Sequence, residues 1–250
     1  MKEKIIPKLA QKPHSFCPGC GHGIINRLIA ETLEEIGYEK KTILTLGVGC
    51  SWNMSRYWSG DMLQAAHGRG SACATGVKVA RPDLLSISYQ GDGDAYVIGL
   101  AETLNAAYRN TPITVFVVNN NNFAMTGGQM SWTTMPGQIT TTSPQGRDPK
   151  KTGFPIKVPE IVSTFENVAY VARGSVHNAK AIRQLQKYIK RAIETQLFGE
   201  GYSLVEILAP CPTNWKKNVL SSSQWMNDEI VPYFPLGELK NKKGSENECS

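Results

Sequence analysis

Oxygen donors that could hold a metal ion stand at the ends of two apolar runs in this sequence. Gly91-Asp92-Gly93-Asp94 ends one run, and Asn119-Asn120 ends the next. Glycines let the backbone approach a phosphate, and the helix that follows offers N–H groups to it. Because a carboxylate repels a phosphate, a cation such as Mg²⁺ is needed between them, and Asn120 can add a neutral oxygen ligand. The pattern favours a phosphate and magnesium site over a simple strand-to-helix turn.

Cysteine is the second chemically active residue type, with 6 in the chain. Four of them are candidate metal ligands, namely Cys17 and Cys20 in a CxxC pair, Cys50 and Cys211. Four thiolates suit zinc or an iron–sulfur cluster, and their spacing alone leaves both open. Cys73 lies in a small-residue stretch and is expected in the core, whereas Cys249 is expected to be a bystander.

The elements that position these residues alternate between strand and helix. Short apolar runs predict strands at 43–48, 84–89, 113–118, 168–172 and 203–208. Helical periodicity and end signals predict helices at 22–37, 71–80, 96–108 and 178–197. This alternation predicts an α/β fold, a mostly parallel sheet with helices on both faces. Since ligands bind at the carboxyl ends of parallel strands, we expect Asp92, Asn120 and the thiols to converge on one edge.

Residues 1–235 are expected to form a single domain, and 236–250 a tail that is mobile or contacts a partner. Residues 119–158 are rich in Asn, Thr, Gly and Pro and carry little periodicity, which is typical of a functional loop. The net charge is +6, partly clustered at 180–191 on one predicted helix face. We interpret that cluster as a solvated face, with docking of an acidic partner as the minor alternative.

Composition excludes several functional classes. No apolar run approaches the ~20 residues of a membrane span. No basic-aromatic groove pattern indicates nucleic-acid binding. The N-terminal sequence lacks the apolar stretch of an export signal, so a cytoplasmic location with reduced thiols is expected.

The motifs together resemble a known family. Gly91-Asp92-Gly93 and Asn119-Asn120, separated by residues 94–118, are similar to the thiamine diphosphate motif of thiamine-dependent enzymes. Further segments look like the β subunit of 2-oxoacid:ferredoxin oxidoreductases: Cys17-Pro18-Gly19-Cys20-Gly21-His22, Gly49-Cys50-Ser51, His67-Gly68-Arg69-Gly70, Met125-Thr126-Gly127-Gly128-Gln129 and Cys211-Pro212. The likeness runs from about Pro13 to Pro212.

The resemblance implies a thiamine diphosphate-binding domain of the pyrophosphate type. It implies magnesium held by Asp92, Asn120 and Asn122, and a [4Fe-4S] cluster held by Cys17, Cys20, Cys50 and Cys211. It implies cofactor contacts from His22, Cys50, Ser51, His67, Gly91, Asp92, Gly93, Asp94, Asn120, Thr126 and Gly127. For His22 a helix-capping role is the competing interpretation, and for His67 a buried, hydrogen-bonded histidine is an equal alternative.

The implied activity is coenzyme A-dependent oxidative decarboxylation of a 2-oxoacid, with electrons passed to ferredoxin. Met125, Ser131, Thr133 and Thr134 resemble the 2-oxoglutarate and branched-chain members more than the pyruvate ones. The glutamate that activates the cofactor is expected on an α-type partner subunit carrying the pyrimidine-binding domain, and small additional subunits are compatible with this assembly. Two alternatives remain open: a subunit of a non-oxidative thiamine decarboxylase or synthase, and a non-catalytic, zinc-stapled binding subunit.

Overall fold

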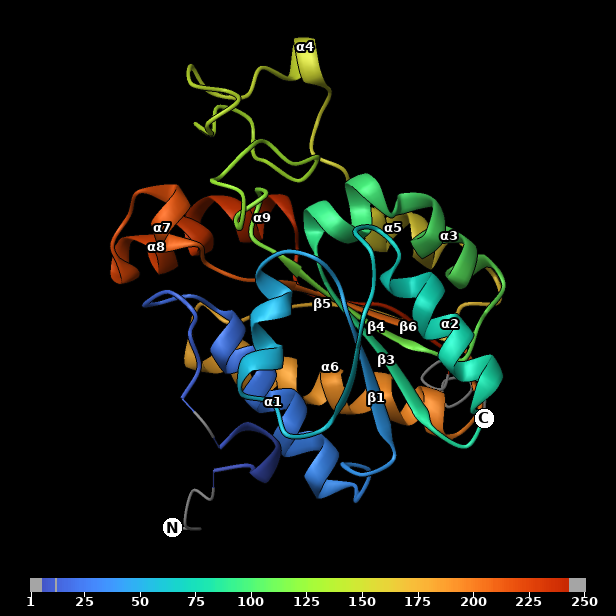
Figure 1. The fold of residues 1–250 in the computed structure, drawn as a ribbon. Helices are drawn as coiled ribbons and strands as arrows, with labels where there is room; N and C mark the ends of the chain where they lie inside the picture. The colour runs from blue at the N-terminus through green and yellow to red at the C-terminus, as the bar shows by residue number, and fades with distance from the viewer. Residues whose placement is uncertain (1–5, 12, 243–250) are drawn as a thin grey trace.

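A seven-stranded sheet forms the centre of the computed structural model, which describes residues 6–11 and 13–242 (Figure 1). The strand order is β2-β1-β3-β4-β6-β5-β7. Neighbouring strands run parallel except β5 and β7, which are antiparallel. The strands are β1 (Thr42–Leu46), β2 (Asp61–Gln64), β3 (Leu85–Gly91), β4 (Thr114–Asn119), β5 (Tyr170–Ser175), β6 (Ser203–Leu208) and β7 (Gly237–Asn241). The predicted α/β fold with a mostly parallel sheet is confirmed.

Helices cover both faces of the sheet (Figure 1). One face packs against α1 (His22–Glu35) and α6 (Ala179–Leu197), and the other against α2 (Gly70–Ala80), α3 (Leu100–Tyr108) and α5 (Val158–Ser163). Successive β4 residues alternate between these two cores, because side chains of a strand point to opposite faces: Phe116 packs on the α1 and α6 side, and Val117 on the other. The continuous apolar runs of the sequence are therefore strands buried on both faces.

Local sequence sets the ends of the long helices. The Asn178 side chain caps α6 by accepting a hydrogen bond from the backbone N–H of Ala181 at 2.8 Å. Just beyond α1, Gly37 adopts the left-handed conformation, with φ of 72°. Both ends lie within two residues of their predicted positions.

The predicted helix 96–108 is divided in two. A π-helical turn, η3 (Gly93–Ile98), follows Asp92, and α3 begins only at Leu100. At the junction, a Cβ on Gly99 would stand 2.3 Å from the backbone carbonyl oxygen of Gly68. The close approach of these two loops therefore requires glycine at position 99. Wide helical turns of this kind are found mostly at functional sites.

The segment between β4 and α5 projects from the body of the molecule, with the short helix α4 (Pro149–Thr152) near its tip (Figure 1). Its residues are ordered by polar contacts. The side chain of Arg147 is 3% exposed and donates to the backbone carbonyl oxygens of Trp132, at 3.0 Å, and Thr134. Such contacts leave no periodic pattern in the sequence, which explains why 119–158 reads as a loop.

Several short elements are not predicted by the sequence. They are η1 (Lys8–Ala10), η2 (Cys50–Arg56), β2, α7 (Pro212–Trp215), α8 (Val219–Trp225), η4 (Met226–Ile230) and α9 (Val231–Tyr233). The last four surround a third apolar core that includes Met226, Ile230 and Phe234. Each is too short to show a clear period.

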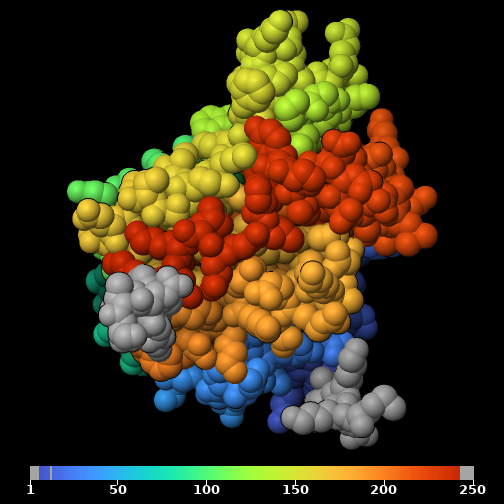
Figure 2. Space-filling view, turned by 180° about the vertical axis from the view of Figure 1, so that it is seen from behind, coloured from blue at the N-terminus to red at the C-terminus, as the bar shows by residue number. Residues whose placement is uncertain are grey.

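The expectation of a tail from residue 236 onward is wrong for Gly237–Asn241, which form strand β7 against β5. Figure 2 shows this red segment lying along the back of the molecule. The backbone N–H of Lys242 also bonds to the carbonyl oxygen of Ala169 at 3.1 Å. The remainder of that stretch, 243–250 with Cys249, lies outside the described residues. Across the described part of the chain, no helix has the length and apolar character needed to cross a membrane.

Candidate functional site

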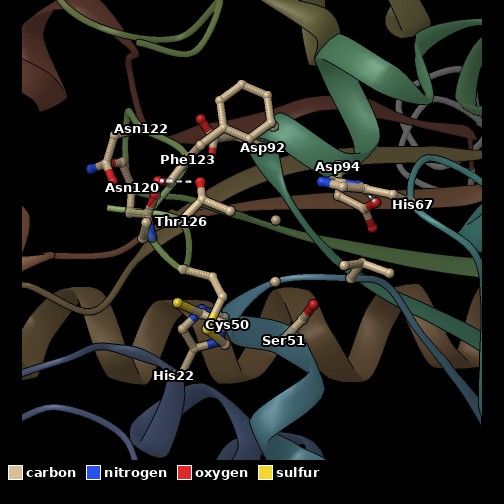
Figure 3. Close-up of a pocket in the computed structure, with 16 residues that line it drawn as sticks. His22, Cys50, Ser51, His67, Asp92, Asp94, Asn120, Asn122, Phe123 and Thr126 are labelled. Atoms are coloured by element: carbon tan, nitrogen blue, oxygen red, sulfur yellow. Dashed lines mark hydrogen bonds and ion pairs between the residues drawn. The ribbon is translucent and has the colours of Figure 1, made fainter. Parts of the chain in front are cut away.

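The carboxyl ends of β1, β3 and β4 open into one pocket (Figure 3). As the sequence predicts, its lining includes His22, Cys50, Ser51, His67, Gly91, Asp92, Gly93, Asp94, Asn120, Asn122 and Thr126. The structure adds Val48, Gly49, Phe123, Ala124 and Met125, all of them apolar or small residues that carry no polar signal in the sequence. Gly127 is not among these lining residues; it is exposed and adopts a positive φ of 113°.

Asp92 is the buried carboxylate of the pocket wall. It is 1% exposed, and it accepts a hydrogen bond from the hydroxyl of Thr133 on the projecting segment. Burial raises the pKa of Asp92 to about 6, although that hydrogen bond acts in the opposite direction. The sequence analysis did not assign Thr133 to the site, because the link between the projecting segment and β3 exists only in the folded chain.

Asn120 presents a side-chain oxygen that has no partner within the described residues. Its Oδ1 is buried and accepts no hydrogen bond, while its backbone oxygen accepts one from Trp215 Nε1 at 3.1 Å. Asn122 lies beside it and donates from Nδ2 to the same backbone oxygen at 2.7 Å. A buried oxygen without a partner costs free energy unless something satisfies it. Asn120 Oδ1 and the Asp92 carboxylate together form a set of hard oxygen donors that suits Mg²⁺.

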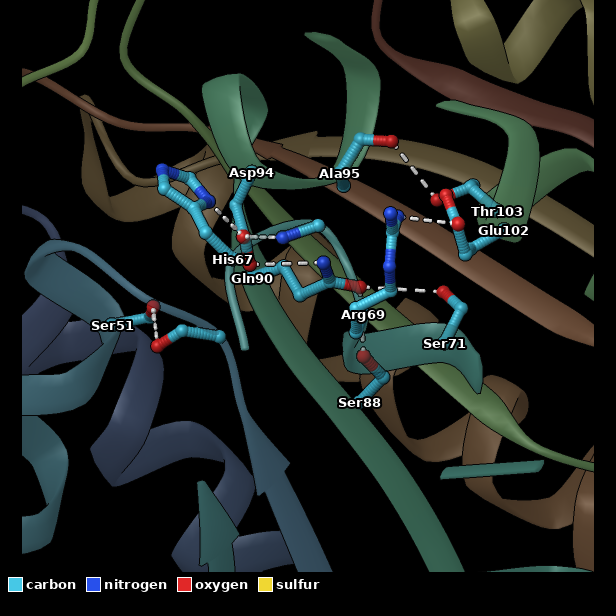
Figure 4. Close-up of polar contacts among 12 residues, drawn as sticks. Ser51, His67, Arg69, Ser71, Ser88, Gln90, Asp94, Ala95, Glu102 and Thr103 are labelled. Atoms are coloured by element: carbon cyan, nitrogen blue, oxygen red, sulfur yellow. Dashed lines mark hydrogen bonds and ion pairs between the residues drawn. The ribbon is translucent and has the colours of Figure 1, made fainter. Parts of the chain in front are cut away.

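Asp94, by contrast, is occupied by the protein itself (Figure 4). Its Oδ1 contacts His67 Nδ1 and accepts from the backbone N–H of Gly68 at 2.6 Å. Its Oδ2 accepts from Gln90 Nε2 at 2.9 Å. Asp94 is 2% exposed, so these contacts fix the loop that carries His67. The side chain of His67 is 34% exposed, so it is hydrogen-bonded but not fully buried, and it faces the pocket.

His22 closes the pocket on the side of α1, next to Cys50 (Figure 3). It is 2% exposed, its Nδ1 lies 2.6 Å from the Tyr89 hydroxyl, and its ring stacks on Phe16 with centroids 5.0 Å apart. Burial lowers the pKa of His22 to about 4, so the ring is neutral at physiological pH. Nearby, the Ser51 hydroxyl donates to the backbone oxygen of Gly47 at 3.1 Å.

The four candidate thiols lie within electrostatic reach of one another. Cys211 is buried, Cys20 and Cys50 are half-buried, and Cys17 is exposed. Burial raises the pKa of Cys20 and of Cys50 to about 12, and the nearby thiols raise both further. Within the described residues, no three His, Cys, Asp or Glu side chains are grouped closely enough to hold a metal ion. Cys73 is half-buried rather than part of the core.

A known protein family matches more than half of this chain. Residues 47–207 match the family described as thiamine pyrophosphate enzyme, C-terminal TPP binding domain. The match begins just after β1 and ends within β6, so it covers β3 and β4, two of the three strands that lead into the pocket.

Relatives with assigned names are subunits of 2-oxoacid oxidoreductases. Ketoisovalerate oxidoreductase subunit VorA of Methanothermobacter thermautotrophicus is 40% identical over 227 residues, which are 91% of this chain and 48% of that protein. 2-Oxoglutarate synthase subunit KorB of Methanocaldococcus jannaschii is 35% identical over 211 residues, which are 80% of this chain and 70% of that protein. The chain thus spans about half the length of VorA.

A solved structure has the same fold. A chain of the 2-oxoglutarate:ferredoxin oxidoreductase from Magnetococcus marinus, with 2-oxoglutarate, coenzyme A and succinyl-CoA bound, matches with a TM-score of 0.78 and 27% sequence identity. The likeness covers 96% of this chain and 86% of that one.

Proposed function

We propose that this chain, which belongs to the family of thiamine pyrophosphate-binding subunits of 2-oxoacid:ferredoxin oxidoreductases, contributes the cofactor half of such an enzyme's active site. The observation that carries the proposal is the pairing of a buried carboxylate, Asp92, with the unpartnered Oδ1 of Asn120 at one pocket. Bound thiamine diphosphate supplies the reactive carbon that adds to the keto group of a 2-oxoacid.

The diphosphate end of the cofactor would be held through magnesium. Asp92, Asn120 Oδ1 and the backbone carbonyl of Asn122 would be the protein ligands, a set of oxygen donors typical of Mg²⁺. Gly91 lines the pocket, and a Cβ added there would meet no atom within 4 Å, so any side chain would extend into the space for the phosphates. Glycine keeps that space open.

The two histidines would serve the cofactor in different ways. His22, neutral and fixed by Tyr89, offers a polar ring without a charge. His67, oriented by Asp94, has its other ring nitrogen free of hydrogen bonds to the described residues, so it can contact the cofactor or the substrate. Thr126 lines the pocket on the opposite side and donates from its hydroxyl to Gln129 Oε1 at 2.5 Å, which holds that turn beside the pocket.

Cys17, Cys20, Cys50 and Cys211 would bind a [4Fe-4S] cluster, which carries single electrons towards ferredoxin. A zinc ion about 2.3 Å from each sulfur draws its four ligands tightly together. Each cysteine of a four-iron cluster binds a different iron atom, so its sulfurs stand farther apart. The electrostatic interaction of Cys20 and Cys50 with the other thiols supports a shared four-thiolate site, and metal analysis distinguishes the cluster from the zinc alternative.

The pocket lining supports a branched-chain 2-oxoacid over 2-oxoglutarate. Val48, Phe123 and Met125 give this chain's share of the pocket an apolar wall, which favours an apolar side chain on the substrate. The 40% identity to VorA is consistent with this preference.

Activity measurements on the complex with its α-type partner test the function. We expect ferredoxin reduction that depends on coenzyme A and thiamine diphosphate, with kcat/KM for 2-oxoisovalerate above that for 2-oxoglutarate or pyruvate. The isolated chain should be inactive, because the activating glutamate is expected on the partner. Decarboxylation by the isolated chain that depends on coenzyme A would contradict that assignment.

Metal analysis separates the alternatives. We expect iron and acid-labile sulfide in the anaerobically purified protein, both lost in Cys50→Ala while thiamine diphosphate still binds. Zinc without iron would instead support the zinc-stapled subunit. Decarboxylation that persists without ferredoxin reduction in the wild type would support a non-oxidative enzyme.

A further inference from the structure

A charged pair lies buried between strands β5 and β6. Arg173 of β5 is 1% exposed and Glu206 of β6 is 0% exposed, and they stand opposite each other in the strand register. Arg173 Nε donates to Glu206 Oε2. On its other side, Arg173 holds Glu160 of α5 with two hydrogen bonds, of 2.7 and 2.6 Å.

Stability alone does not account for this pair. Removing two charges from water costs several kcal/mol per ion, and well-packed apolar residues of similar volume are often as stable or more so. The residues on either side of Glu206 in β6, Val205 and Ile207, are buried and apolar. Arg173 occupies Oε2 of Glu206, so a role for the pair has to involve the other carboxylate oxygen, Oε1.

That oxygen fixes the side chain of Asn119. Glu206 Oε1 accepts from Asn119 Nδ2 at 3.1 Å, and Asn119 Oδ1 then accepts from the backbone N–H of Asn121 at 3.1 Å. An ionised carboxylate can only accept hydrogen bonds, so it forces the amide nitrogen of Asn119 towards itself and the amide oxygen towards Asn121. The charge of Glu206 thus decides which way Asn119 points.

The bond to Asn121 shapes the turn that carries the magnesium ligands. Asn121 adopts a left-handed conformation with φ of 60°, which asparagine tolerates better than most other non-glycine residues, and the bond from its N–H to Asn119 Oδ1 helps to hold it there. It separates Asn120 from Asn122, the two ligands assigned under the proposed function. A change in its backbone conformation would turn Asn120 Oδ1 away from Asp92.

We propose that Glu206, held by Arg173, is a positioning residue for the magnesium-binding turn, acting through Asn119 and Asn121. The inference rests on the proposed function only for the identity of the metal; the effect on the turn itself is a property of this chain alone. Substituting Glu206 by glutamine keeps its volume but allows the amide of Asn119 to turn over, which removes the acceptor for Asn121.

A matched pair of variants in the full-length chain tests this positioning. Glu206→Gln and Glu160→Gln each neutralise one carboxylate partner of Arg173, but only Glu206 touches Asn119. We expect both to lower the thermal unfolding midpoint. Only Glu206→Gln should accelerate hydrogen exchange of the Asn121 amide, by about tenfold or more, as measured by NMR without ligand. Equal exchange rates in the two variants would overturn the proposal.

Binding provides the second measurement. The Mg²⁺ concentration that half-saturates thiamine diphosphate binding, followed by calorimetry, should rise about tenfold in Glu206→Gln and stay within about twofold in Glu160→Gln. If the wild type binds no thiamine diphosphate with Mg²⁺, the proposed function fails, whereas the exchange result on Asn121 still decides the positioning role.

A double variant distinguishes loss of the hydrogen bonds between Glu206, Asn119 and Asn121 from a general loss of structure. In Glu206→Gln with Asn119→Asp, the glutamine can donate to the aspartate, whose other oxygen accepts from Asn121. We expect this double variant to restore slow exchange at Asn121, and the single Asn119→Asp variant, with two carboxylates facing each other, to lose thermal stability. Failure of the double variant to restore protection would count against the proposed hydrogen-bond relay.

Discussion

Thr133 and Asp92 come from segments far apart in the sequence, and a single hydroxyl joins them. The hydroxyl of Thr133 orients the carboxylate that faces Asn120. Because hydrogen bonds to charged groups contribute about 1.5–3 kcal/mol, Thr133→Val should weaken Mg²⁺-dependent thiamine diphosphate binding by about tenfold or more. Isothermal titration calorimetry measures this. Thr133→Ser keeps the hydroxyl and should bind nearly as the wild type does; equal affinities for the Val and Ser variants would rule out this role.

The buried carboxylate of Asp92 affects both the stability of the chain and cofactor binding. Its charge is buried, so Asp92→Asn removes a desolvation cost from the folded chain. Without Mg²⁺, we expect the thermal unfolding midpoint of Asp92→Asn to equal or exceed that of the wild type, while cofactor binding falls at least about tenfold. Differential scanning calorimetry and titration together check this. A variant that binds the cofactor normally would remove Asp92 from the site.

Sequence reasoning found the ligands of the pocket more readily than their supports. Asp92, Asn120, Cys50 and Cys211 follow strands, and the parallel sheet brings strand ends together. Thr133, Trp215 and Glu206 support those residues from segments whose positions depend on tertiary packing. A single sequence holds no signal for such contacts between distant segments.

Among the elements, the junction between η3 and α3 is the one most dependent on a single residue. A Cβ at Gly99 would collide with the Gly68 backbone, so Gly99→Ala should lower the free energy of unfolding by about 1–3 kcal/mol. Gly76 lies on the exposed face of α2, and a Cβ added there would have no atom within 4 Å. Gly76→Ala should therefore raise the free energy of unfolding by about 0.5–1 kcal/mol. Urea denaturation measures both; shifts of the same sign would contradict this packing.

Long elements were predicted because their patterns are redundant. Helix α6 repeats its apolar face over five turns, and β4 and β6 are mostly apolar, with Val115–Val118 uninterrupted in β4. Short elements such as β2 and α7 present four residues each, too few to distinguish one period from another. The sequence predicts an ordinary helix from residue 96, whereas Gly93–Ile98 form a π-helical turn, a distinction that the residue pattern does not carry.

Strand β7 completes one side of the sheet, in a stretch that the composition predicts to be a tail. A chain ending after Leu236 would lack β7, and we expect its free energy of unfolding to fall by about 1–3 kcal/mol, or a few degrees in melting midpoint. A chain ending after Lys242 keeps the complete strand and should match the full-length protein. Thermal unfolding followed by circular dichroism compares the two, and equal midpoints would show that β7 contributes little.

The two outermost strands also limit how this protein can associate with other chains. On one side β2 has four residues and includes Asp61, and on the other β7 has five and includes Glu238 and Lys240. Short, charged border strands resist the addition of a foreign strand, which is how natural sheets avoid aggregating border to border. Another chain that binds this protein is therefore expected to contact helices and loops, such as the projecting segment that carries Thr133, instead of extending the sheet.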